Sequence, residues 1–98
     1  MYSLISLITL HESAKHNYDS IMLHPDSQCG CFCCLKKFKA SEVKEFTHDY
    51  VNTEVGKRLV GHTAICPMCE IDSVLCSIDV PDLSYDMFKQ MQDYWFNA

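Results

Sequence analysis

Residues 29–35, "CGCFCCL", and residues 65–69, "ICPMC", each contain two cysteines separated by two residues. Such a spacer lets a tight turn direct both sulfurs toward one tetrahedral ion about 2.3 Å away. Two turns of this kind supply four thiolates, which is the ligand set of a structural zinc site. We therefore predict one structural Zn²⁺ ion, with the ligands Cys31, Cys34, Cys66 and Cys69.

Three further cysteines lie close to this pattern. Cys29 and Cys33 are alternative ligands, since Cys29 begins the "CGC" stretch and Cys33 is adjacent to Cys34, although only Cys31 with Cys34 repeats the spacing of the second pair. Cys76 lies in the apolar run "SVLC" and is interpreted as a small buried hydrophobic residue.

The four-cysteine pattern bears on catalysis as well as on structure. Four thiolates fill the coordination shell of zinc and leave no position for a reacting water, so the site is expected to be structural. A thioredoxin-like interpretation of "CPMC" needs a βαβ setting. The β-branched residues around Cys66 predict strands instead.

The composition indicates a small protein of a reducing compartment. The chain has 98 residues, 48% of them apolar, and an odd count of seven cysteines. The odd count and the lack of a basic signal segment predict a cytoplasmic location. The apolar run Leu4–Leu10 is far shorter than the roughly 20 residues of a membrane span, so no membrane association is expected.

Charge argues against a nucleic-acid partner. The formal net charge is -5, and residues 59–98 hold one lysine against six acidic residues. Four metal-bound thiolates would add further negative charge. Such a molecule repels phosphate backbones. The same acidity raises an alternative, in which the protein mimics nucleic acid and occupies a basic groove.

The sequence predicts helices in the N-terminal, central and C-terminal parts of the chain. Apolar spacings of three and four predict one amphipathic helix over residues 3–23, with His11 and His16 as partly exposed positions. Ser41 is a candidate N-cap for a short helix with Val43 and Phe46 on its buried side. Ser84 is expected to cap a final helix, whose apolar side would comprise Met87, Phe88, Met91, Tyr94 and Trp95.

The segments between these helices are expected to hold the strands. Residues 47–62 contain two glycines and predict a loop with a strand near Val55 to Val60. "TAIC" and "DSVLCSIDV" predict two strands that form a hairpin around Cys66 to Cys69.

These elements predict an α+β fold: a small zinc-ribbon or treble-clef-like domain with two CxxC knuckles, a small antiparallel sheet and N- and C-terminal helices. We expect one zinc-stabilised domain over residues 1–98, divided into an N-terminal helix (1–26), a zinc-binding core (27–80) and a C-terminal helix (81–98).

The sequence also resembles a known family. "CGCFCCLKKFKASEVKEF", "HTAICPMCEIDSVL" and "MQDYWF" are similar to a pattern CxCFxCL…TAxCPxCxIDSV in small cytoplasmic zinc-ribbon-like proteins of bacteria and their phages. The resemblance covers roughly residues 27–96 and implies a metal-binding fold with the same four cysteine ligands. It supplies no activity. Glu70 stands where glycine often follows the knuckle, and the turn there often needs a positive φ.

One enzymatic alternative uses residues between the two pairs. His48 with Asp49, followed by Asn52 and His62, superficially resembles the order in HNH-like metal-dependent nucleases. The acidic segment after Cys69 and the overall charge weigh against it. His48, Asp49 and His62 are interpreted as solvated loop residues.

The resulting functional expectation is a non-enzymatic interaction module, such as a regulator or inhibitor of a host or cellular protein. Tyr94, Trp95 and Phe96 are consecutive, so on a helix at least one points outward and can anchor a protein partner. Pairing with a second copy of the chain is an open alternative.

Overall fold

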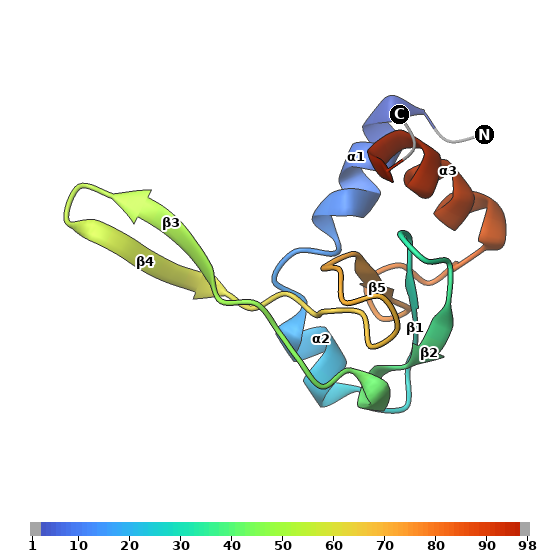
Figure 1. Ribbon diagram of the computed structural model, residues 1–98, viewed down its shortest axis with the longest axis horizontal. Helices are drawn as coiled ribbons and strands as arrows, with labels where there is room; N and C mark the ends of the chain where they lie inside the picture. Colours follow the sequence, from blue (N-terminus) through green and yellow to red (C-terminus); the bar gives the residue numbers. More distant parts are fainter. Residues whose placement is uncertain (1–2, 97–98) are drawn as a thin grey trace.

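The computed structural model describes residues 3–96 (Figure 1). The helices are α1 (Leu4–Glu12), α2 (Tyr18–Leu23) and α3 (Tyr85–Phe96), with one 3₁₀ turn, η1, at Ala40–Glu42. The strands are β1 (Gln28–Cys31), β2 (Lys37–Lys39), β3 (Asp49–Thr53), β4 (Gly56–Gly61) and β5 (Val74–Cys76). The α+β class is therefore confirmed. Within residues 3–96, no helix combines the length and the apolar character that crossing a membrane requires.

The central element is β1, which pairs antiparallel with β2 on one side and β5 on the other. Side chains alternate between the two faces of a strand. Cys29 and Cys31 face a core cluster that also contains Ile21 of α2 and Val43. Leu75, on β5, belongs to a second cluster, to which α3 contributes three buried residues and α1 contributes Leu7. The three-stranded sheet is thus covered on both faces.

Helix α3 follows its predicted pattern except at Tyr94, which was expected on the apolar side and is 41% exposed. The Ser84 hydroxyl accepts a hydrogen bond from the Met87 amide (3.2 Å), as expected of an N-cap. Met87, Phe88 and Met91 are buried in the second cluster. A Cβ at Gly30 would lie 2.7 Å from the Phe88 ring. The glycine therefore lets α3 pack directly against β1.

The single helix predicted over residues 3–23 is wrong, because the chain breaks between α1 and α2. His16 has φ 54°, and the next residue, Asn17, is buried. The Asn17 side chain accepts a hydrogen bond from the Ala64 amide (2.9 Å) and donates one to the Val74 carbonyl (3.0 Å). Satisfying these buried backbone groups outweighs continuing the helix.

The helix predicted from Ser41 is also wrong. The segment forms only η1, and Lys39 precedes it as the capping position. Its amide donates to the Glu42 carboxylate over 2.7 Å. The chain then continues extended at Val43, φ -75° and ψ 122°, because this side chain is buried against α2 and the first cluster.

The predicted hairpin around Cys66 to Cys69 is wrong in its pairing. The second expected strand exists as β5, but its partner is β1, with Cys29 opposite Cys76 and Cys31 opposite Val74. The first expected strand is reduced to one isolated bridge between Ala64 and Phe46. Because the two cysteine turns face each other, β5, which follows the second turn, lies beside β1, which leads into the first.

Residues 47–62 form a hairpin where a loop was predicted, and we call β3 and β4 together the arm. The expected strand near residues 55–60 corresponds to β4. Tyr50 pairs with Leu59 and Val51 with Arg58. The arm extends away from the body of the molecule (Figure 1), and its side chains beyond Asp49 are exposed up to Val60.

We predict that Asn17→Ala strongly destabilises the fold. The change leaves the buried Ala64 amide and Val74 carbonyl without their partner, which costs roughly 2–5 kcal/mol of unfolding free energy. Urea denaturation followed by circular dichroism measures the loss. Asn52→Ala, on the exposed arm, is the control and should stay within about 0.5 kcal/mol of the unmodified protein. Equal midpoints for the two variants would contradict the role assigned to Asn17.

Candidate metal centre

The first knuckle begins at the end of β1. The Cys31 carbonyl accepts from the Leu35 amide (2.9 Å), and the Cys31 amide donates to the Lys36 carbonyl (3.0 Å). The Cys33 amide is directed at the Cys31 sulfur, 3.3 Å away. Closing this turn puts Leu35 at φ 62°.

The second knuckle repeats the first almost bond for bond. The Cys66 carbonyl accepts from the Glu70 amide (3.0 Å), and the Cys66 amide donates to the Ile71 carbonyl (2.9 Å). The Met68 amide lies 3.3 Å from the Cys66 sulfur. Glu70 has φ 65°, which confirms the expectation that this position needs a positive φ. Leu35 and Glu70 therefore both adopt a strained positive φ, and this conformation lets the two sulfurs of each turn point in the same direction.

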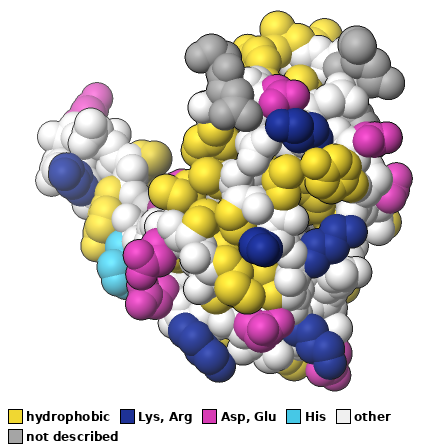
Figure 2. All heavy atoms as spheres, turned by 45° about the vertical axis from the view of Figure 1, so that its right-hand side comes forward, with side chains coloured by type: hydrophobic (Ala, Val, Ile, Leu, Met, Phe, Trp, Pro, Cys, Tyr) yellow, Lys and Arg dark blue, Asp and Glu magenta, His cyan; other side chains and the backbone are white. Residues whose placement is uncertain are grey.

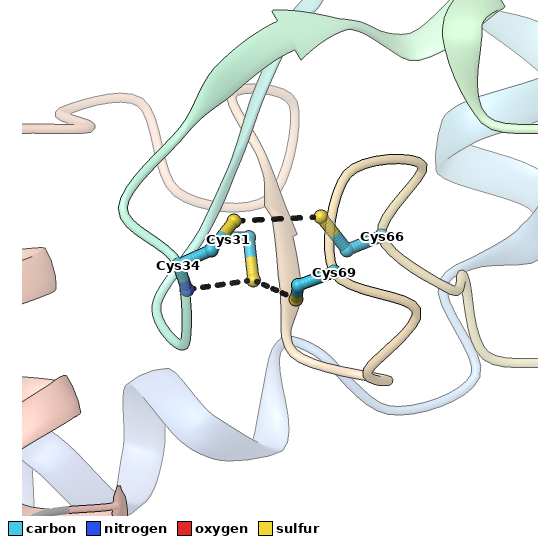
Figure 3. A group of neighbouring side chains, drawn as sticks. All are labelled: Cys31, Cys34, Cys66 and Cys69. Carbon is cyan, nitrogen blue, oxygen red and sulfur yellow. Dashed lines mark hydrogen bonds between the residues drawn. The ribbon is translucent and has the colours of Figure 1, made fainter.

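The two knuckles face each other, and their sulfurs form one group (Figure 3). All four sulfurs lie within 4.8 Å of one another. The Cys31 and Cys69 sulfurs are 3.6 Å apart, and those of Cys34 and Cys66 are 3.7 Å apart. Ligands on a tetrahedral ion with bonds of about 2.3 Å would be about 3.8 Å apart. The four predicted ligands could therefore hold a metal ion.

The surroundings of the sulfurs set their protonation. Burial raises the pKa of Cys31 to about 11, although the Ser73 hydroxyl, 2.9 Å away, favours the thiolate. Burial also raises the pKa of Cys69. The pKa of Cys34 is lowered, because the Lys36 amide and neighbouring thiols outweigh the opposing effect of burial. A bound cation would displace the protons of Cys31 and Cys69 and stabilise their thiolates.

The two alternative ligands lie outside this group. Cys29 is fully buried and pairs across the sheet with Cys76, whose sulfur lies 3.1 Å from the Ser27 hydroxyl. Cys76 is fully buried too, as predicted. Cys33 is half-buried within the first knuckle, and its carbonyl accepts from the Gln92 side chain (2.8 Å). In the described part of the chain, no other set of three or more His, Cys, Asp or Glu side chains has comparable geometry.

The base of the arm contains the residues of the nuclease alternative, in a different pairing. The Asp49 carboxylate accepts from the hydroxyls of Thr47 and Thr63 and lies 2.8 Å from His16 Nδ1. His48 instead contacts His62. The expected pair of His48 with Asp49 is thus replaced by His16 with Asp49.

Sequence reasoning missed this part of the molecule. His16 is 33 positions from Asp49, and its ring occupies the space beside Gly61, where a Cβ would lie 2.8 Å from Nδ1. Asn52 lies exposed on the arm. The interpretation of His48, Asp49 and His62 as solvated loop residues is wrong for Asp49 and His62, which are half-buried and hydrogen-bonded. No local pattern links residues so far apart in the chain.

The aromatic triplet at the end of α3 divides as expected. Tyr94 is 41% exposed and Phe96 43% exposed. Trp95 is partly buried in the second cluster and packs against His11, with ring centroids 4.3 Å apart. Tyr94 and Phe96 are therefore the members of the triplet that a partner could contact.

We predict that Cys66→Ser abolishes metal binding and unfolds the chain. Structural sites of this type contribute roughly 10 kcal/mol or more at neutral pH, which exceeds the net stability of most small domains. Cys33→Ser is the matched control, because it removes a knuckle thiol outside the group. It should retain the metal and the fold. Elemental analysis and circular dichroism measure both properties, and a folded, metal-loaded Cys66→Ser protein would refute the role of this ligand.

We predict that Glu70→Gly stabilises the protein by about 0.5–1 kcal/mol, because glycine adopts the positive φ without steric cost. The matched control is Glu45→Gly, since Glu45 is not among the residues with positive φ. It should be neutral or destabilising, as the unfolded chain gains freedom without relief of strain. Denaturation midpoints of the metal-loaded variants give the comparison. Destabilisation by Glu70→Gly equal to that of the control would show that the turn carries no strain.

Comparison with protein-family models, with curated proteins and with solved structures finds no match to this chain.

Proposed function

We propose that this protein is a non-enzymatic interaction module, held together by one structural Zn²⁺ ion, that regulates or inhibits a protein partner by binding it through the arm. The observation that carries the proposal is the exposure of apolar side chains along an arm that stands apart from the body. A cytoplasmic location is part of the proposal, because seven thiols suit a reducing compartment.

The choice of zinc is supported by the donor set. Four thiolates in tetrahedral arrangement favour zinc or iron among biological metals. Zinc has no redox chemistry and is the common ion where four cysteines brace a small fold. A filled shell leaves no position for substrate, which supports a structural role over a catalytic one.

The arm supports binding to another protein. Val55 at its tip is 98% exposed, and Tyr50 and Leu59, which are cross-strand partners, are 55% and 46% exposed. Hydrophobic side chains are visible on the arm in the space-filling view (Figure 2). A two-stranded hairpin alone is marginally stable in water. Contact with a partner would cover these side chains and stabilise the arm.

The partner's chemistry follows from the two long edges of the arm. β3 and β4 form a sheet of only two strands, so each strand has an outer edge with backbone groups available for pairing. Lys57 and Arg58 add positive charge on β4. We propose that the arm accepts an extended segment of the partner that carries acidic side chains, through strand addition.

Native mass spectrometry with elemental analysis tests the zinc. We expect one tightly held zinc per chain, and seven reduced thiols after denaturation. Removal of the zinc with a strong chelator should abolish the folded circular dichroism signal, because binding and folding are coupled. Iron in place of zinc, or a disulfide within either pair, would overturn this part of the proposal.

Affinity purification with an arm variant tests partner binding. The double variant Tyr50→Ser with Leu59→Ser removes one apolar cross-strand pair, and we expect at least a tenfold loss of the captured partner. Tyr85→Ser with Ile78→Ser is the matched control, because it removes one exposed tyrosine and one exposed aliphatic residue elsewhere. The control should bind normally. Equal recovery by both double variants, with zinc content unchanged, would exclude the arm as the binding surface.

A further inference from the structure

We propose that His48 and His62, together with the main-chain carbonyl of Thr47, form a second metal site for a divalent transition-metal ion at the base of the arm. The site is separate from the four-cysteine group and does not depend on the proposed partner. His48 directly precedes β3 and His62 directly follows β4. An ion bound here would join the two ends of the arm.

The two donor–donor distances that involve His62 Nδ1 fit one ion. His48 Nδ1 and His62 Nδ1 are 3.2 Å apart. Two nitrogens bound to a tetrahedral Zn²⁺ ion at 2.0–2.1 Å would be about 3.3 Å apart. The Thr47 carbonyl oxygen is 3.0 Å from His62 Nδ1. The two imidazole rings are inclined at 78° in a T-shaped arrangement and are not stacked.

Proton counting gives a second reason for an ion. The Thr47 carbonyl can only accept a hydrogen bond, and it faces the same His62 nitrogen as His48 Nδ1 does. One hydrogen on His62 Nδ1 can serve both neighbours only as a shared, three-centre hydrogen bond. Protonating both Nδ1 atoms would leave two N–H groups opposed at 3.2 Å. A cation would instead be bound by the lone pairs of His48 Nδ1, His62 Nδ1 and the Thr47 carbonyl oxygen. Imidazole nitrogen suits Zn²⁺, Ni²⁺ and Cu²⁺.

The surrounding hydrogen bonds hold Thr47 in place. Its amide donates to the Thr63 carbonyl (2.8 Å), and its hydroxyl donates to the Asp49 carboxylate. The Thr63 amide in turn donates to the Thr47 hydroxyl (3.2 Å). Such partners fix the direction of a ligand before a metal arrives.

His62 is fixed from another side of the site. Its carbonyl accepts from the Tyr18 amide (3.1 Å), and its ring packs against the Tyr18 ring with centroids 5.5 Å apart. His48 is exposed, so an ion can reach the site from solvent. A histidine side chain is visible beside acidic side chains where the arm meets the body (Figure 2).

Zinc titration of the protein already loaded at its cysteine site tests the proposal. Equilibrium dialysis and native mass spectrometry at neutral pH should detect a second, weaker equivalent of Zn²⁺. His48→Ala and His62→Ala should each weaken this second binding at least tenfold and leave the first equivalent in place. His24→Ala is the matched control, since His24 is exposed at the end of α2. It should bind both equivalents.

The design remains decisive if one variant misfolds. Should His62→Ala lose both equivalents, the exposed His48 decides the result, because its substitution disturbs no core contact. Binding of only one Zn²⁺ by the unmodified protein at saturating metal would overturn the proposal. A second equivalent that persists unchanged in His48→Ala would also overturn it and would assign the binding to other groups, such as the Cys29 or Cys33 thiols.

Discussion

The meeting of the two cysteine knuckles is the constraint on which the rest of the structure depends. Thirty-one residues separate Cys34 from Cys66, and little in that segment would by itself bring the two turns together. Once four sulfurs lie within 4.8 Å, the strand entering the first knuckle and the strand leaving the second become neighbours. The pairing of β1 with β5 therefore follows from the cysteine group, and the division of the core into two clusters follows from that pairing.

The arm lies outside the part of the fold that the cysteine group organises. Neither core cluster includes a residue of β3 or β4, so the arm is held only at its base. The Asp49 carboxylate accepts hydrogen bonds from the hydroxyls of Thr47 and Thr63 and contacts the ring of His16. These contacts connect the arm to the break between α1 and α2. The arm is the surface through which we propose that a partner binds. Metal binding at His48 and His62 would adjust the stiffness of the arm.

Much of the site and part of the fold were predictable, because they depend on local sequence. The CxxC spacing identified the four clustered cysteines, and the turn that follows each pair requires a positive φ whatever the rest of the fold. Helix α3 was predictable because its cap at Ser84 and its buried residues lie within one continuous helical repeat. Burial of Cys76 followed from its apolar neighbours. That these cysteines bind zinc stays a prediction.

The sequence by itself therefore determined the knuckles, the sulfur donors and the C-terminal helix, since each depends on residues a few positions apart. Tertiary structure alone decided the break at Asn17, the partner of β5 and the pairing of His16 with Asp49. In each of these cases a buried or half-buried polar group finds its hydrogen-bond partner more than 30 residues away. Apolar periodicity carries no information about such partners, because it records which side of an element is buried and not what that side meets.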